Sequence, residues 1–135
     1  MFITRRVEFS ASHVCRKQDL DEAANRALYG AAANPNGHGH NYWLEVTLEG
    51  DPDPVTGMVF DLKELKDILN REVIEAMDHR FLNYEVPPFD RVVPTVENVA
   101  VEIWRRLAPR FSGNVKLARV RLYETEDLFV DYSGE

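Results

Sequence analysis

The chain contains a single cysteine, Cys15, among its 135 residues. One thiol excludes an intramolecular disulfide framework and is typical of proteins from a reducing compartment. No run approaches the ~20 apolar residues that a membrane-spanning helix needs. The N-terminus, Met-Phe-Ile-Thr-Arg-Arg, lacks the apolar stretch of a secretory signal peptide. Together these absences predict a cytoplasmic protein.

Positive charge is also scarce, because 16 Lys and Arg face 23 Asp and Glu, which gives a net charge of −7. A general nucleic-acid binder would normally carry a basic stripe, so this class is disfavoured. A membrane partner is not expected either. An anionic substrate would need positive charge concentrated at its site. Arg16, Lys17 and Arg80 are candidates for that charge because each lies near a histidine in sequence, with a solvated face as the alternative.

The length fits one domain, residues 1–135, with an ordinary 44% of apolar and 29% of charged residues. Alternating or helical apolar spacing predicts these elements: a strand over 2–13, a short helix over 19–28 capped by Asp19 or Asp21, a strand over 40–50, helices beginning at Asp61 and Thr95, and strands over 115–123 and 127–132 around a turn at 124–126. This order predicts an α+β fold with an antiparallel sheet covered on one face.

Residues 34–42 read Asn-Pro-Asn-Gly-His-Gly-His-Asn-Tyr and carry the strongest functional signal. In an extended segment His38 and His40 point to the same side. If the strands are neighbours, His13 supplies a third imidazole, and three imidazoles with an open position are typical of catalytic zinc. Ordinary loop polarity or hydrogen bonding is the alternative for the pair alone. The inward parity of all three histidines favours a metal.

Asp78 precedes His79 just after the first long helix. A carboxylate beside an imidazole raises its basicity, as a general base requires. A histidine at a helix C-terminus, where the helix dipole favours positive charge, explains the same residues equally well.

Four further residues have both a functional and a structural interpretation. Glu124 suits bidentate contact with the N–H and amino edge of a guanine-like or pterin ring, although a solvated carboxylate is the commoner case. Thr95 and Glu97 fit a helix N-cap and first turn. Cys15 shares the parity of His13, so it is either a core residue or a reactive thiol.

The sequence resembles the 6-pyruvoyl-tetrahydropterin synthase family, including its 6-carboxy-tetrahydropterin synthase branch, over nearly the whole chain. The resemblance is carried by Phe-Ser-Ala-Ser-His at 9–13, the nonapeptide at 34–42, and the segments 53–58, 62–65, 78–79, 95–104 and 123–125. It implies a T-fold (tunnelling fold) with a four-stranded antiparallel sheet, helices on one face and trimers that close a barrel. It also implies a homohexamer with active sites at subunit interfaces.

For the site, the resemblance implies that His13, His38 and His40 bind zinc. It also implies that Glu124 anchors a pterin, with Thr95 and Glu97 in the substrate-binding segment, and that Asp78 and His79 transfer protons. The family's catalytic cysteine lies six residues before the first histidine of His-x-His, where this chain has Ala32. Members with Glu there cleave the substrate side chain instead, and Ala32 matches neither pattern.

Three explanations of Ala32 stay open: Cys15 supplies the thiol, the reaction is altered and relies on zinc and His79, or the substitution, natural or engineered, disables the enzyme. The resemblance predicts a zinc-dependent lyase acting on 7,8-dihydroneopterin triphosphate, with 6-pyruvoyl- or 6-carboxy-tetrahydropterin as product. A 6-hydroxymethyl product and a catalytically silent zinc- and pterin-binding protein are alternatives. A zinc hydrolase is weaker, because it leaves Glu124 and His79 without roles.

Overall fold

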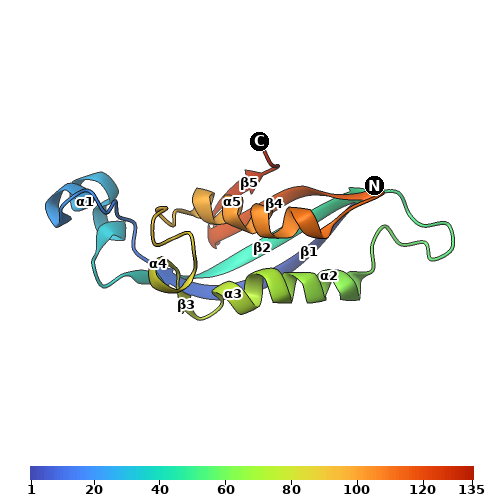
Figure 1. Ribbon diagram of the computed structural model, residues 1–135, viewed down its shortest axis with the longest axis horizontal. Coiled ribbons are helices and arrows are strands. Elements are labelled where there is room, and N and C mark those ends of the chain that lie inside the picture. Colours follow the sequence, from blue (N-terminus) through green and yellow to red (C-terminus); the bar gives the residue numbers. More distant parts are fainter.

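The computed structural model describes residues 1–135 as one twisted sheet with helices packed on one of its faces (Figure 1). The strand order is β3-β1-β2-β4-β5. Three long strands, β1 (Phe2–His13), β2 (His38–Gly50) and β4 (Val115–Thr125), are antiparallel neighbours, and β5 (Leu128–Tyr132) pairs with β4. The predicted α+β class and antiparallel strands are confirmed.

The sheet has five strands, so the expectation of four was wrong. The additional strand, β3 (Arg80–Phe81), runs parallel to the end of β1. It is held there because Ser10 N–H donates to the Asp78 carboxylate at 2.9 Å and His79 N–H donates to the Ser10 carbonyl at 2.6 Å. Two residues are too few to show alternation, so the sequence pattern gives no sign of this strand.

Glu124 lies within β4, which extends to Thr125, and not in the turn where the sequence pattern placed it. The register against β5 shifts between Tyr123 and Thr125. This irregularity interrupts the simple alternation from which the end of the strand was inferred.

The first long helix has three parts: α2 (Leu62–Leu69), the π-helical segment η2 (Asn70–Ile74) and α3 (Glu75–Met77). The second is α5 (Val96–Leu107), which continues into the short η3 (Ala108–Arg110). Asp61 accepts from Lys63 N–H and Thr95 from Asn98 N–H, so both predicted helix starts are confirmed. The short helix α4 (Leu82–Glu85) follows β3.

The apolar faces of these helices bury the inner face of the sheet. The residues that are fully buried there include Leu44, Val46, Leu48, Leu65, Leu69, Val73, Met77, Val99, Ile103 and Leu122. Leu62, the first residue of α2, is 51% exposed and does not belong to this core.

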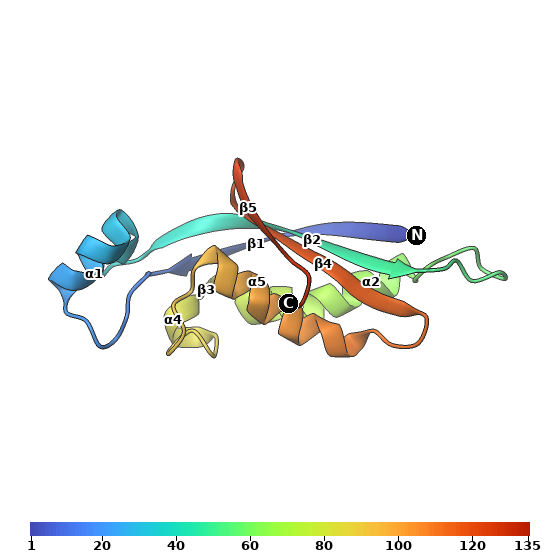
Figure 2. The same cartoon turned by 90° about the horizontal axis from the view of Figure 1, so that it is seen from above.

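Residues 14–37 link β1 to β2 and project beyond the end of the sheet, and we call them the arm (Figures 1 and 2). The arm contains α1 (Glu22–Tyr29) and the 3₁₀ turn η1 (Gly30–Ala33). Asp21 caps α1 by accepting from Ala24 N–H, which is one of the two predicted caps. None of the helices in the chain has the length and apolar character to cross a membrane.

Candidate metal centre

His13, His38 and His40 meet at the end of the sheet from which the arm projects. β1 and β2 are neighbours, with His13 directly opposite His38 and Ala11 opposite His40. One ring nitrogen from each of the three lies within 4.8 Å of the others. The structure therefore brings together the three imidazoles that the sequence pattern placed on one side.

The tautomer of His13 is fixed by its surroundings. Its Nδ1 lies 2.6 Å from the Pro94 carbonyl oxygen, which only accepts, so Nδ1 carries the proton. The lone pair is then on Nε2, which lies 3.1 Å from His38 Nε2. Two nitrogens bound to one tetrahedral zinc are separated by roughly 3.3 Å. The pair is thus arranged as ligands usually are, with an outer carbonyl that orients the ring.

Two observations test whether the cluster fits a metal. His40 Nε2 is buried and has no hydrogen-bond partner. Burial lowers the pKa of His13 and of His40, and the neighbouring His38 lowers both further, which favours the neutral imidazole that metals require. The donor set fits zinc, which prefers imidazole nitrogen in a tetrahedral arrangement.

Glu124 reaches the same cluster from β4. Its carboxylate oxygen Oε1 lies 3.8 Å from His40 Nε2, too far for a hydrogen bond, and its side chain is mostly buried. A buried carboxylate without a strong partner retains acceptor capacity for a ligand. The structure therefore places Glu124 in the site, contrary to the commoner solvated case.

Tyr42 was not singled out from the sequence and belongs to this site. Its ring stacks on Phe9 at 5.0 Å and lies edge-on to His40 at 5.6 Å. Its hydroxyl is buried without a partner, and burial, followed by Glu124 and Cys15, raises its pKa. The sequence signal was available, since Tyr42 shares the inward parity of His38 and His40.

Cys15 lies beside Ala32, because the Cys15 N–H donates to the Ala32 carbonyl at 2.9 Å. The side chain is buried. Burial, followed by the carboxylates of Glu124 and Glu97, raises the pKa of the thiol to about 11, so it keeps its proton at neutral pH.

The start of α5 packs close to the cluster through Pro94, whose carbonyl holds His13. Thr95 acts as the N-cap of α5, accepting from Asn98 N–H at 3.3 Å, so its structural interpretation is confirmed. Glu97 lies in the first turn of α5, close enough for its carboxylate to raise the pKa of the Cys15 thiol. Both residues therefore lie at the edge of the site.

Asp78 and His79 touch each other but do not contact the histidine cluster of the same chain. His79 Nδ1 donates to Asp78 Oδ2 at 2.9 Å, and Asp78 also accepts from Ser10 N–H. His79 has a φ of 59°, and its side chain is 83% exposed. Asp78 thus orients the His79 imidazole, whose opposite nitrogen, Nε2, has no contact with Asp78.

Comparison with known proteins shows the family of the chain. A family model described as 6-pyruvoyl tetrahydropterin synthase matches residues 2–135. The chain belongs to this family. The 6-pyruvoyl tetrahydrobiopterin synthase of Homo sapiens is 44% identical over 133 residues, which are 98% of this chain and 91% of that protein.

Two further relatives extend the comparison. The solved 6-pyruvoyl tetrahydropterin synthase of Caenorhabditis elegans superposes with a TM-score of 0.94 at 37% identity, covering 100% of this chain and 96% of the other. The dihydroneopterin monophosphate aldolase of Pyrococcus furiosus is 31% identical over 96% of this chain and 94% of its own length. The expected family, the T-fold of the subunit and the assignment as a lyase are confirmed.

Proposed function

We propose that this chain is a zinc-dependent lyase that converts 7,8-dihydroneopterin triphosphate to 6-pyruvoyl- or 6-carboxy-tetrahydropterin. The observation that carries the proposal is the group of three inward imidazoles within 4.8 Å, with Glu124 beside it. Family membership supports the pterin substrate, since the human relative is named as a 6-pyruvoyl tetrahydrobiopterin synthase.

Zinc held by His13, His38 and His40 would supply a Lewis acid for an oxygen of the substrate side chain. Glu124 would accept the N–H and amino edge of the pterin ring through both carboxylate oxygens. Thr95 and Glu97, at the N-terminus of α5, would line the ring pocket. In this arrangement Glu124 would hold the ring, and the hydroxylated carbons of the substrate side chain would lie over the imidazoles.

His79, oriented by Asp78, would move protons during the reaction. Because Asp78 accepts from Nδ1, the opposite nitrogen, Nε2, is free to take a proton from substrate. The 83% exposure of the His79 side chain supports an active site shared between subunits. We therefore propose a homohexamer, a dimer of trimers, in which His79 faces the cluster of a neighbouring copy.

Cys15 would replace the thiol that the family carries at position 32. Its main chain is bonded to Ala32, and the carboxylates of Glu124 and Glu97 are close enough to raise the pKa of its thiol. Elimination of triphosphate would give the pyruvoyl product, and cleavage of a carbon–carbon bond would give the carboxy product.

The test is incubation with 7,8-dihydroneopterin triphosphate and zinc, with products identified by mass, for wild type, Cys15→Ala and Ala32→Cys. We expect product from wild type and a loss of about 10²–10⁴ in rate for Cys15→Ala. An unchanged rate in Cys15→Ala would refute the surrogate thiol. Binding of substrate by wild type without any product would refute the lyase.

Metal binding is tested separately by measuring the zinc content of His13→Ala and His79→Ala. We expect His13→Ala to lose zinc and His79→Ala to retain it, because only His13 belongs to the cluster. Full zinc occupancy in His13→Ala would rule out this residue as a ligand.

A second candidate function is cleavage of the side chain to a 6-hydroxymethyl pterin. The similarity to the Pyrococcus furiosus protein, named as an aldolase, favours it. A third is a silent zinc- and pterin-binding protein, favoured by Ala32, which offers neither thiol nor carboxylate. The mass of the product distinguishes the first two, and its absence identifies the third.

A further inference from the structure

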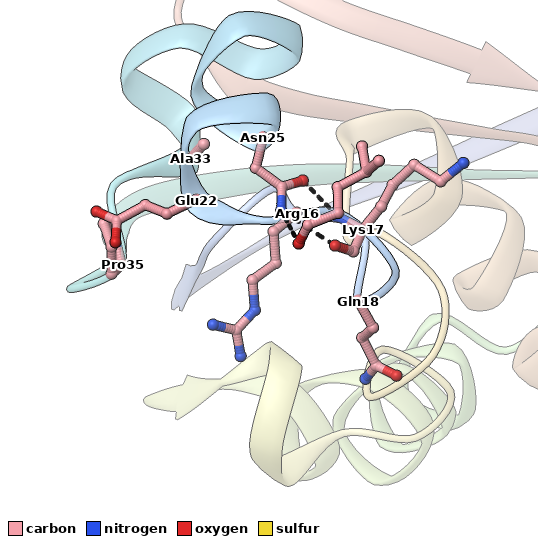
Figure 3. Close-up of a pocket in the computed structure, with 8 residues that line it drawn as sticks. Arg16, Lys17, Gln18, Glu22, Asn25, Ala33 and Pro35 are labelled. Carbon is pink, nitrogen blue, oxygen red and sulfur yellow. Dashed lines mark hydrogen bonds between the residues drawn. The ribbon is translucent and has the colours of Figure 1, made fainter.

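A cavity of about 440 Å³ lies in the arm, between the segment that follows β1 and helix α1 (Figure 3). Its lining includes Arg16, Lys17, Gln18, Glu22, Asn25 and Ala33. Both segments that carry the histidines lead into it, since Arg16 is three residues after His13 and Ala33 is five before His38. Along both chain segments, the cavity is therefore only a few residues away from the candidate metal centre.

The walls of this cavity have a fixed shape. Buried Asn83 bonds both the N–H and the carbonyl of Val14, each at 2.9 Å. Cys15 is bonded to Ala32, and buried Asn25 accepts from Lys17 N–H at 2.8 Å while donating to the carbonyl of Lys17. Because these contacts hold successive residues, Arg16 projects from a rigid base.

The cavity also carries positive charge that no carboxylate neutralises. Ten of the sixteen Lys and Arg side chains form ion pairs, and neither Arg16 nor Lys17 is among them. The Arg16 guanidinium has only a 3.4 Å contact to the Tyr84 hydroxyl. In a chain with a net charge of −7, such unpaired cations at a cavity indicate an anionic ligand.

The directions of the side chains single out Arg16. Figure 3 shows Arg16 and Gln18 extending to the same side of the loop, whereas Lys17 extends to the other side. The one carboxylate of the lining, Glu22, points away from Arg16. A guanidinium is suited to phosphate oxygens. Gln18 Nε2 donates one N–H to the Asp90 carbonyl and has a second N–H to offer beside it.

We propose that this cavity binds the polyphosphate chain of a phosphorylated pterin, with Arg16 as its main contact. The inference rests on the proposed function. Glu124 lies beside His40 in the histidine cluster, and Arg16 follows His13 by three residues along the chain. A ring, a hydroxylated side chain and a phosphate ester follow one another in the same order in the substrate.

The experiment measures binding of inorganic triphosphate by calorimetry, and KM for 7,8-dihydroneopterin triphosphate and for dephosphorylated 7,8-dihydroneopterin. The variants are Arg16→Gln and, as a matched control, Arg26→Gln, which removes the same charge from an exposed position of α1 that does not line the cavity. Loss of one charged hydrogen-bonding contact weakens binding roughly 10- to 100-fold.

In Arg16→Gln we expect the affinity for inorganic triphosphate to fall by this factor and KM for 7,8-dihydroneopterin triphosphate to rise by the same factor, while KM for dephosphorylated 7,8-dihydroneopterin stays unchanged. Arg26→Gln should behave like wild type in all three measurements. Wild-type affinity for triphosphate in Arg16→Gln would overturn the proposal, and so would an equal rise in KM for the dephosphorylated compound. If triphosphate binds through Arg16 but no pterin product forms, the anion site stands and the proposed function fails. If product forms with an unchanged KM in Arg16→Gln, the function stands and the anion site fails.

Discussion

The main-chain N–H of Cys15 donates a 2.9 Å hydrogen bond to the carbonyl of Ala32. This bond joins the two segments of the arm beside the histidine cluster. The only cysteine of the chain is therefore bonded through its main chain to Ala32, the position at which the family resemblance implies a catalytic cysteine. Variants at positions 15 and 32 therefore test directly at which of the two positions the reaction needs a thiol.

In a Cys15→Ala background, Ala32→Cys should raise the turnover of the pterin substrate by about 10²–10⁴, because one correctly placed proton-transfer group typically contributes that factor. Ala32 is only partly buried, so the larger side chain can be accommodated. Steady-state kinetics measure the effect, and Ala31→Cys, which adds the same thiol at an exposed neighbouring position, is the control. If both variants turn over no faster than Cys15→Ala alone, position 32 cannot supply the thiol of the reaction.

Gly37→Ala should destabilise the protein and reduce its zinc content. Gly37 has a φ of 73°, and an added Cβ would lie 2.8 Å from Phe81 Cε2 and 3.1 Å from the His13 carbonyl oxygen. Positive φ alone costs a non-glycine residue about 1–2 kcal/mol, and the clash beside His13 adds to it.

The control for Gly37 is Gly57→Ala, because Gly57 has a φ of 74° but nothing within 4 Å of an added Cβ. Thermal unfolding and metal analysis separate the two effects. Gly57→Ala should show only the backbone cost and keep its zinc. Equal behaviour of the two variants would mean that the close approach of Gly37 to His13 has no consequence for the site.

Asp78 should make stability depend on pH in the acid range. The bond from Ser10 N–H, followed by contacts with His79, holds the pKa of Asp78 below its usual value. The folded-state pKa is thus lower than that of the unfolded chain, about 3.9. Ionised Asp78 therefore stabilises the native state above about pH 4, and this contribution is lost as the pH falls through the lowered pKa.

Asp78→Asn keeps an oxygen for Ser10 N–H but removes the ionisation. Between about pH 5 and about pH 3, its free energy of unfolding should fall less steeply than that of wild type. Denaturant titrations measure the slopes. Asp67→Asn, the same change at an exposed position of α2, should follow wild type. Parallel curves for wild type and Asp78→Asn would contradict the expectation.

Tyr42→Phe should increase the free energy of unfolding by about 1 kcal/mol. A buried polar group without a partner costs about 1–3 kcal/mol in lost hydration, and the Tyr42 hydroxyl has none in the folded chain. Tyr132→Phe is the control, because the Tyr132 hydroxyl donates to the Glu135 carbonyl at 2.9 Å and its removal brings no gain. Reduced stability in Tyr42→Phe would reveal a partner for that hydroxyl in solution.

Several local features could be predicted from the sequence because they depend on the spacing of neighbouring residues. Alternation defined β1 and β2 and placed His13, His38 and His40 on one side, and Asp61 and Thr95 marked the helix starts. Features with little local pattern were missed or misplaced. β3 has only two residues, and the irregularity after Tyr123 concealed that Glu124 belongs to a strand.

The sequence by itself determined the family, the faces of the strands and the histidines that share one face. Only the tertiary structure decided which strands are neighbours, and thus that His13 lies opposite His38. It also decided that the Pro94 carbonyl fixes the His13 tautomer and that Cys15 lies beside Ala32. These contacts join residues distant in sequence, whereas periodicity reports only on neighbours along the chain.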